Sequence, residues 1–517
     1  MKNLKYMAVA ALLACGALNA SAKDNVEYVD PFIGTTNFSI CNPGAIRPHG
    51  LMSVVPFNVM GSDLNVQDKD KRWWSACYEY NNKYFTGFAH VTLSGVGCPE
   101  MGTLLTMPTS GELCVDYRSY GSEYKNETAR PGYYSTELTK YGIKCEVAST
   151  LRSSIERYTF PKGKGNLLFN LGNGLTNEVG ASLRRVSDTE FEGTRLLGTF
   201  CYNPQAVFPM YFVVRVNKKP AAYGMWKKQP AFGNAQAQWD SDQGKYKLYP
   251  GYGRDMAGND IGYYMSYDCA EGEQVEVQVG VSFVSIANAR ENLNAEQKGF
   301  EFEKVVKEGH DEWARTLDRV TVEGGTEDQR RVFYTALYHT QIHPTVLQDV
   351  NGEYPKMESN ENGKTAGNRY TVYSLWDTYR NLSQLETLLY PDKQVDMINS
   401  MIDMYREWGW MPKWELFSRE TWTMEGDPAI PYITDAYMRG LRGFDINEAY
   451  KAFRTSATTE GKNNRMRPDI DVHRAWLRAD GLLCCRYVGR QLRVARSRVL
   501  PRRQRALYTC WRTRTQG

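Results

Sequence analysis

The stretch QVEVQVGVSFVS at residues 274–285 stands just before a change in sequence pattern that decides the fold. Every second residue from Val275 to Phe283 is apolar, which is the period-two pattern of a β-strand with one buried face. From residue 294 to 320 the chain reads NAEQKGFEFEKVVKEGHDEWARTLDRV, which is charged and typical of a helix. The sequence therefore predicts a β-rich part up to residue 285 and a helical part after it.

The part before residue 285 contains further segments with strand character. SIERYTF (154–160), GNLLFNLG (165–172) and MYFVVRV (210–216) are separated by turns rich in Gly, Asn and Pro. Many short strands without intervening helices predict an antiparallel β-sandwich.

After the charged segment, apolar residues recur at helical spacing. DKQVDMINSMIDMYREW (392–408) and DPAIPYITDAYMRG (427–440) each place them along one stripe, and the second ends in the C-cap signal Gly440. The stripes are Val395, Ile398, Ile402 and Tyr405 in the first segment, and Ile430, Ile433 and Tyr437 in the second.

The first residues have the composition of an export signal. Lys2 and Lys5 precede an apolar run, and Ala20-Ser21-Ala22 forms an A-x-A cleavage site. The run is too short for a membrane span. We expect an exported protein, periplasmic or secreted. The alternative is an outer-membrane lipoprotein anchored at Cys15, because residues 12–15 also resemble a lipoprotein cleavage box.

Charge divides the chain at residue 473. The formal net charge is +4, but residues 473–517 carry twelve arginines against one acid, Asp480, so residues 1–472 carry −7. A mildly acidic globular body has no broad reason to bind nucleic acid. We therefore expect no nucleic-acid partner.

Cysteine spacing argues against a zinc site. None of the cysteines between the signal and residue 473 forms a C-x-x-C pair, so we expect mostly buried free thiols. These cysteines are Cys41, Cys77, Cys98, Cys114, Cys145, Cys201 and Cys269.

The candidate site is a zone of tryptophans and carboxylates in SLWDTYRN and EWGWMPKWELFSRETWTMEGDP. Aromatic rings cover the apolar faces of a sugar, and charged oxygens accept hydrogen bonds from its hydroxyls. A purely structural role is the alternative for each residue taken alone, since Asp377 could pair with Arg380 and the tryptophans could lie in the core. The zone contains Trp376, Trp408, Trp410, Trp414 and Trp422, interleaved with Asp377, Glu415, Glu420, Glu425 and Asp427.

Rigid loops before residue 103 are weaker candidates. SICNPGAIRPHG and GFAHVTLSGVGCPEMG carry His49 and His90, and either line a site or connect strands. In a strand, Trp73 and Trp74 would face opposite sides, which leaves one ring open for stacking.

Several motifs, in order along the chain, resemble glycoside hydrolase family 92, the exported calcium-dependent exo-α-mannosidases of bacteria. They run from about Val29 to Val472. They are VDPFIGT, NPGAIRPHGLMSVVP, GFAHVTLSGVGCPEMG, FYTALYHTQIHP, DVNGEY, YSLWDTYRN, INSMIDMYREWGWMPKW, GDPAIPYITDAYMRGLRGFD and RPDIDV.

The resemblance implies a β-sandwich, a helical linker and an (α/α)6 barrel, with the site where sandwich and barrel meet. Together with the pattern above it divides the chain into a signal peptide (1–22), a sandwich (23–285), a linker (286–325), a partial barrel (326–472) and an aberrant tail (473–517). It also implies an inverting mechanism with a general acid and a general base, and a Ca²⁺ ion that binds sugar hydroxyls.

The resemblance also implies the substrate-binding residues, with an α-mannoside oligosaccharide or N-glycan as partner. Trp376 and Asp377 match positions that hold the terminal mannose, and Asn42 belongs to the sandwich loop that reaches the site. Glu420, Trp422 and Asp427 match a second loop. The family's catalytic acid, base and calcium ligands follow the RPDIDV motif, so we assign no catalytic or metal-binding residue.

Residues 473–517 do not continue the family pattern. A nucleic-acid arm would mix Lys with Arg, and Pro501 interrupts an amphipathic membrane helix. A shifted reading frame explains the surplus of arginine with stray Cys and Trp. We therefore expect a fragment that is inactive as written, because the remaining helices are too few for a twelve-helix barrel.

Two other functions remain open. One is a non-catalytic mannan-binding protein, which retains the sugar without cleaving it. The other is an α-glycosidase or phosphorylase of another specificity on the same plan.

Overall fold

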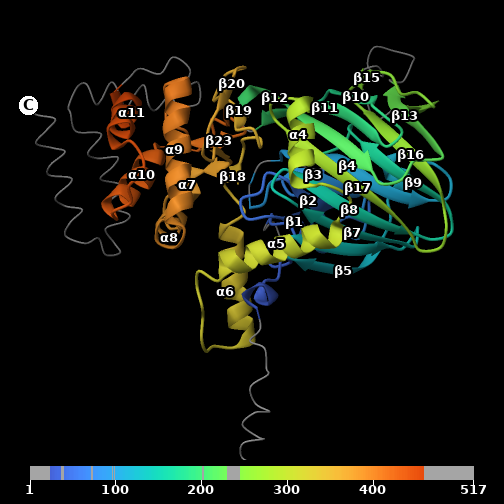
Figure 1. The fold of residues 1–517 in the computed structure, drawn as a ribbon, viewed down its shortest axis with the longest axis horizontal. Helices are drawn as coiled ribbons and strands as arrows, with labels where there is room; N and C mark the ends of the chain where they lie inside the picture. The colour runs from blue at the N-terminus through green and yellow to red at the C-terminus, as the bar shows by residue number, and fades with distance from the viewer. Residues whose placement is uncertain are drawn as a thin grey trace, which may run out of the picture.

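The structure is a computed structural model that describes residues 24–458, except 37–39, 72–73, 96, 98, 201–202, 230–244 and 425. A strand-rich part and a helical part lie side by side, with short strands between them (Figure 1). The expected signal peptide and the arginine-rich tail lie outside the described residues. The boundaries drawn from sequence between sandwich, linker and helical part stay predictions.

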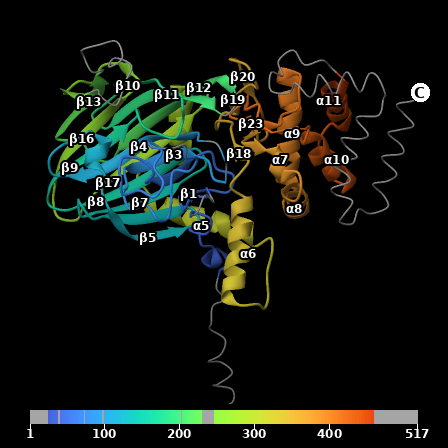
Figure 2. The ribbon, with the colours of Figure 1, turned by 180° about the vertical axis from the view of Figure 1, so that it is seen from behind.

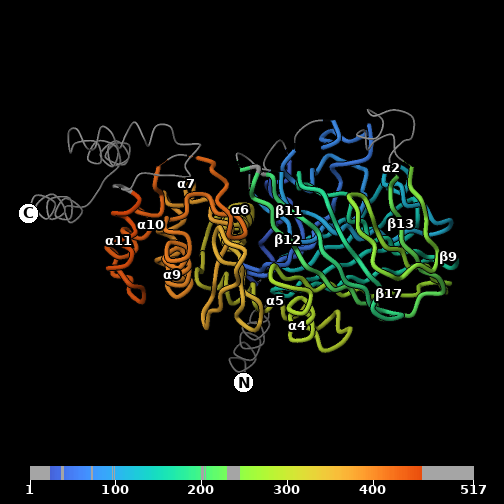
Figure 3. Tube along the Cα trace, turned by 90° about the horizontal axis from the view of Figure 1, so that it is seen from above, coloured from blue at the N-terminus to red at the C-terminus, as the bar shows by residue number. Residues whose placement is uncertain are grey.

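Two large antiparallel sheets face each other as a sandwich, whose layers are seen from above in Figure 3. The eight-stranded sheet has the order β1 (Ala45–Ile46), β2 (Ser53–Phe57), β3 (Gly87–Thr92), β4 (Met101–Ser110), β9 (Gly163–Asn170), β16 (Ile261–Cys269), β13 (Ala222–Gln229) and β14 (Lys245–Pro250). The nine-stranded sheet has the order β15 (Met256–Gly258), β10 (Ala181–Arg185), β11 (Glu190–Phe200), β12 (Asn203–Val216), β17 (Glu273–Ser282), β8 (Ser153–Phe160), β7 (Ile143–Ser149), β6 (Tyr133–Leu138) and β5 (Tyr124–Arg130). The predicted antiparallel sandwich is confirmed.

Strand β17 pairs with β8 and β12 near the middle of its sheet. Its alternate valines, from Val275 to Val281, are fully buried in the core, as their spacing predicted. The opposite face of the strand is buried too, with Gln278 only 1% exposed. The reason is helix α4 (Ile286–Glu296), which packs against this outer face, so that Ala289 and Leu293 contact the sheet at Gly280.

The helical part follows the sandwich along the chain, seen from behind in Figure 2. Its helices are α5 (Phe302–Leu317), α6 (Glu327–Thr340), α7 (Leu375–Thr378), α8 (Leu382–Leu389), α9 (Pro391–Trp408), α10 (Ala429–Met438) and α11 (Ile446–Thr458). Two short helices, η1 (Asn25–Tyr28) and α2 (Tyr117–Tyr120), belong to the N-terminal part. None of the helices within the described ranges is long and apolar enough to cross a membrane.

Helices α9 and α10 confirm the sequence patterns that predicted them. Ile398 and Ile402 of α9 and Ile433 of α10 are buried. Gly440 lies just past the end of α10 with a φ of 97°, a left-handed conformation that glycine adopts without strain.

Short antiparallel strands lie between the sandwich and the helices. They are β18 (Thr345–Val346) with β21 (Tyr370–Thr371), β19 (Glu353–Pro355) with β20 (Asn362–Lys364), and β22 (Tyr373–Ser374), β23 (Trp414–Leu416) and β24 (Arg419–Glu420). The tryptophan and carboxylate zone is carried by these strands and by α7 and α9.

Free thiols occur at the five described cysteines, of which Cys77, Cys145 and Cys269 are buried. Cys98 and Cys201 lie outside the described residues. The expectation of mostly buried free thiols therefore holds for these five.

Candidate functional site

The loop between β23 and α10 is fixed against the sandwich. The side-chain amide of Asn203, at the start of β12, donates a hydrogen bond of 2.7 Å to the main-chain carbonyl of Glu420. The ring of Phe417 stacks on Phe208 with centroids 5.8 Å apart and packs on Phe283 at 4.4 Å. One hydrogen bond and two aromatic contacts thus hold the predicted site to the sandwich, although these residues lie far apart in sequence.

A second junction joins the first sandwich loop to the segment after α6. His49 donates from Nδ1 to the carbonyl of Pro344 at 2.7 Å, and its main-chain N–H donates to Gln341 at 2.7 Å. Ser94 donates its main-chain N–H to Nε2 of His343 at 3.1 Å. Burial lowers the pKa of His49 to about 3 and that of His343 to about 4, so both rings are neutral here. His49 thus connects two parts of the fold.

His90 lies within strand β3 and is fully buried. Its Nε2 lies 2.5 Å from Glu156, and its Nδ1 lies 2.7 Å from the carbonyl of Leu104. Trp74 is also buried, and Trp73 lies outside the described residues. Of the two interpretations of these early loops, the structural one therefore holds for His90, and Trp74 offers no open ring.

Glu415 is buried completely at the centre of the small three-stranded sheet. Its carboxylate accepts hydrogen bonds from the hydroxyl of Thr371 at 2.8 Å and from the main-chain N–H groups of Val372 at 3.0 Å and Ser418 at 2.5 Å. Burial raises the pKa of Glu415 to about 7, and these donors act in the opposite direction. This carboxylate shapes the loop and does not face solvent.

Glu420 is buried in the next strand. Its two oxygens accept the main-chain N–H groups of Lys413 at 2.8 Å and Trp414 at 3.1 Å. Burial raises the pKa of Glu420 to about 8, and the nearby carboxylate of Glu358 adds to the increase. We predicted that Glu420 binds substrate. The structure places its side chain inside the loop, and the predicted role is untested.

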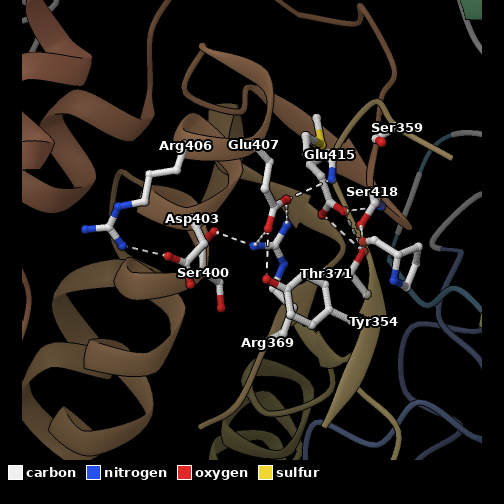
Figure 4. A network of polar contacts seen from close by, with 12 residues as sticks. Tyr354, Ser359, Arg369, Thr371, Ser400, Asp403, Arg406, Glu407, Glu415 and Ser418 are labelled. Carbon is white, nitrogen blue, oxygen red and sulfur yellow. Dashed lines mark hydrogen bonds and ion pairs between the residues drawn. The ribbon is translucent and has the colours of Figure 1, made fainter. Parts of the chain in front are cut away.

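An ion pair between Arg369 and Glu407 lies behind this sheet (Figure 4). Nη2 of Arg369 lies 2.9 Å from Oε2 of Glu407, and the two side chains are only 1% and 9% exposed. Glu407 also accepts from the hydroxyl of Tyr354 at 2.9 Å and the main-chain N–H of Met357 at 2.8 Å. The network fixes the end of α9 to β19 and β21, next to Glu415.

The backbone of the zone is strained at several residues other than glycine. Positive φ angles between 48° and 67° occur at Val372, Phe417, Ser418, Trp422 and Met424. Such conformations cost about 1–3 kcal/mol each and concentrate at functional sites. The cluster therefore supports a functional role for this junction independently of the side chains.

Trp376 and Asp377 lie in the first turn of the short helix α7. Asp377 is exposed, and its carboxylate accepts a hydrogen bond of 2.7 Å from Ser374. Trp376 is half-buried, with the guanidinium of Arg380 4.8 Å from its ring. Arg380 therefore stacks on the tryptophan, and the next residue, Asp377, has an exposed carboxylate.

Trp422 and Asp427 are both half-buried. The Trp422 ring meets Trp408 edge-on with centroids 5.6 Å apart, and the Asp427 carbonyl accepts the N–H of Ile430 in the first turn of α10. Of the other tryptophans of the zone, Trp414 is 5% exposed and belongs to the core, whereas Trp410 is half-buried. Glu425 lies outside the described residues.

Asn42 is buried within the sandwich. Its amide donates to the carbonyl of Leu93 at 3.1 Å, and its Oδ1 accepts the N–H of Gly44 at 3.2 Å. This side chain ties its own loop to the end of β3. The structure thus places Glu420 and Trp422 on one loop, Trp376 and Asp377 on α7, and Asn42 in the sandwich.

Sequence reasoning missed Asn203, Phe417 and the partnership of Arg369 with Glu407. Asn203 lies 217 residues from Glu420, and no local pattern marks such a contact. Glu407 sits among charged residues of α9 that the helical pattern assigns to a solvated face. Only its burial reveals the ion pair.

A calcium ion does not fit the described residues. In the ranges between 24 and 458 that the structure describes, no group of three or more His, Cys, Asp or Glu side chains is arranged to hold a metal. Calcium takes six to eight oxygen ligands, several of them carboxylates. The carboxylates of Glu407, Glu415 and Glu420 are already occupied by main-chain and side-chain donors.

The fold is a β-sandwich joined to helices, with tryptophans and carboxylates at the junction. The family model of the glycosyl hydrolase family 92 N-terminal domain matches residues 28–282, and that of the family's catalytic domain matches residues 288–481. The chain belongs to glycoside hydrolase family 92, which confirms the resemblance seen in the sequence.

Solved structures agree with this assignment. An α-mannosidase of the family from Bacteroides thetaiotaomicron is 28% identical with a TM-score of 0.75, over 85% of this chain and 57% of that one. An inverting mannosidase of the family from the same organism, 23% identical with a TM-score of 0.69 over 84% of this chain and 55% of that one, shares the fold. An uncharacterized secreted glycosidase of Arthroderma benhamiae is 24% identical over 84% of this chain and 52% of its own length. The chain thus spans little more than half the length of these relatives.

Proposed function

We propose that this chain is part of an exported exo-α-mannosidase and that its junction zone holds the terminal mannose of an α-mannoside. The proposed substrates are N-glycans or mannans. Membership of family 92 supports this proposal, as does the likeness to an α-mannosidase solved in complex with mannoimidazole, 27% identical with a TM-score of 0.75 over 86% of this chain and 57% of that one. Export rests on the N-terminal sequence pattern and on the relative described as secreted.

One observation carries the proposal. Helix α7 carries the exposed carboxylate of Asp377 and the half-buried ring of Trp376 at consecutive positions of its first turn. An aromatic ring covers the apolar face of a pyranose, and a carboxylate accepts hydrogen bonds from its hydroxyls. By contrast, Glu415 and Glu420 are closed off by their own hydrogen bonds, so Asp377 is our first candidate for a direct contact with the sugar.

For hydrolysis we propose inversion, in which a carboxylic acid and a carboxylate about 6.5–9.5 Å apart act on opposite faces of the sugar. We assign neither role to a described residue, because the buried carboxylates of the zone already hold the protein backbone. We likewise propose that the calcium ligands lie outside the described residues. We further propose that residues 1–517 lack a working acid and base, so that this polypeptide binds mannosides without cleaving them.

Calorimetric titration of the 517-residue protein with mannoimidazole tests the binding. We expect saturable binding that weakens at least about tenfold in Trp376→Ala and in Asp377→Asn, since a hydrogen bond to a charged group contributes about 1.5–3 kcal/mol. Phe333→Ala, which removes a ring that is 38% exposed on α6, is the matched control and should bind like the parent. Equal binding by all four proteins would contradict the assignment of the site.

Release of mannose from α-linked mannobiose tests the second part of the proposal. We expect none from this polypeptide, with or without added calcium. Calcium-dependent release would show that the chain carries its own acid, base and metal ligands. Binding without turnover in a longer protein that continues the family pattern would instead favour the mannan-binding alternative.

A further inference from the structure

Two cations, the half-buried Lys69 and the buried Arg195, hold one loop of the sandwich. Nζ of Lys69 and the guanidinium of Arg195 donate to carbonyl groups of the loop at residues 171–180. Every second carbonyl of the loop from Gly174 to Gly180 is an acceptor. Lys69 donates to Gly174 at 2.5 Å and Thr176 at 3.3 Å, and Arg195 donates to Glu178 at 2.9 Å and Gly180 at 3.2 Å. Buried carbonyl groups need donors, and here side chains provide them in place of a neighbouring strand.

The carboxylate of Glu100 lies beside these cations and is fully buried. Its Oε1 accepts the main-chain N–H groups of Met101 at 3.0 Å, in β4, and of Gly198 at 3.2 Å, in β11. The positive charges of Lys69 and Arg195 act on this carboxylate. Glu100 and Arg195 are buried, and Lys69 is half-buried. Glu100, next to β4 of one sheet, therefore links that sheet to Gly198 in β11 of the other. Gly198 also donates to the hydroxyl of Thr176 in the loop at 3.2 Å.

Gly198 is the point at which the β11–β12 hairpin bends. Its φ is 121°, and a Cβ atom there would lie 1.8 Å from the carbonyl oxygen of Ala206. The pairing of β11 with β12 changes register between Gly198 and Phe200. Beyond this bulge the hairpin leads to Asn203, whose amide holds the carbonyl of Glu420. The position of Gly198 thus decides where Asn203 meets the helical part.

We propose that Lys69, Glu100 and Arg195 are positioning residues for the sugar site, acting through the β11–β12 hairpin on Asn203 and the strand of Glu420. Lys69 and Arg195 hold the loop at residues 171–180, and Glu100 holds Gly198 at the bulge. The bulge sets the position of Asn203, which holds the loop that carries Trp422. The part that concerns sugar affinity rests on the proposed function. The part that concerns the order of the loop does not.

Hydrogen exchange by mass spectrometry tests the positioning directly. In Glu100→Gln and in Asn203→Ala, we expect the amides of residues 413–424 to exchange at least about tenfold faster, because their anchor to the sandwich is loosened. The control is Glu190→Gln, which breaks ion pairs with Arg215 and Arg290 at the other end of the same hairpin. This variant should lose stability and leave exchange at residues 413–424 within about twofold of the parent.

Affinity for mannoimidazole in the same variants tests the connection to function. We expect the effects of Glu100→Gln and Asn203→Ala to be non-additive, with the double variant binding about as weakly as the weaker single one, because both act on one path. Glu190→Gln should bind like the parent.

Four results test the two proposals. Faster exchange in Glu100→Gln confined to residues 171–200 would overturn the positioning role, as would additive losses of affinity. If the variants show the expected exchange pattern but the parent protein binds no mannoimidazole, the positioning role is confirmed and the sugar site is refuted. Equal exchange changes in Glu100→Gln and Glu190→Gln would reduce the role of Glu100 to general stability and so contradict the inference.

Discussion

Replacing Arg369 by Met is the sharpest test of how the site is supported. The guanidinium is buried against Glu407 and also donates to the carbonyl of Ser400 at 3.2 Å, while its plane lies 4.7 Å from the ring of Tyr354 (Figure 4). Removing it leaves the carboxylate of Glu407 in a nearly dry environment with only the donors of Tyr354 and Met357. The remaining negative charge is then uncompensated.

The magnitude follows from that geometry. Removing one partner of a buried ion pair costs about 3–5 kcal/mol of stability. Because two donors remain on Glu407, we expect the free energy of unfolding to fall by about 3 kcal/mol. With a urea dependence of about 1–3 kcal/mol per molar, the midpoint of the transition that reports the helical part should fall by at least about 1 M. Urea titration followed by tryptophan fluorescence measures this shift, with an unchanged slope as the check on the transition.

Two variants make the measurement decisive. Arg406→Met removes the arginine next to Glu407 in α9, whose pair with Asp403 at 2.8 Å is 50% and 35% exposed, and should cost less than about 1 kcal/mol. Arg369→Met combined with Glu407→Leu removes both buried charges and should be more stable than Arg369→Met alone. If Arg369→Met costs no more than Arg406→Met, the reasoning from burial is refuted.

Three further variants address the rest of the molecule. In Glu420→Gln, stability should depend less on pH. The pKa of Glu420 is about 8 in the folded protein and about 4.3 in the unfolded chain, so the folded parent binds this proton more tightly. The parent therefore loses stability as the pH rises between those values. Urea midpoints at about pH 5 and pH 8 should therefore converge in the variant, and an unchanged difference would contradict the role of burial. Gly198→Ala should prevent formation of the hairpin because its Cβ meets a carbonyl oxygen, whereas Gly299→Ala, with nothing within 4 Å, should fold normally; soluble yield of both would disprove the clash. Trp313→Ala should cost about 3–5 kcal/mol by opening a cavity. Trp313→Phe keeps most of the ring volume but loses the indole donor to Ile46 at 2.8 Å, and should cost less, about 1–3 kcal/mol. Equal losses in thermal unfolding would show that packing is not the dominant contribution.

Much of the architecture was predictable because its signals are local. The alternate valines of β17 and the apolar stripes of α9 and α10 repeat at the spacing of the element they form. Gly440 marks the end of α10 because a left-handed residue there favours glycine. The order of family motifs then identified the family without any structural comparison.

The site was predictable only as a region. The density of tryptophan and carboxylate marked the segment that we propose as the sugar site, but not the separate environments of its members. Asp377 is exposed whereas Glu415 and Glu420 are buried, although all three occur in similar polar surroundings in the sequence. Burial depends on what packs against a residue, and short-range pattern does not contain that information.

The sequence by itself determined the division into strands and helices, the family and the segment that carries the site. The tertiary structure alone decided which polar groups meet: Asn203 with the carbonyl of Glu420, Arg369 with Glu407, and Lys69 and Arg195 with the carbonyls of one loop. The physical reason is range. Periodicity and capping act over one or two turns of chain, whereas desolvation and ion pairing depend on groups that only folding brings within a few ångströms of each other.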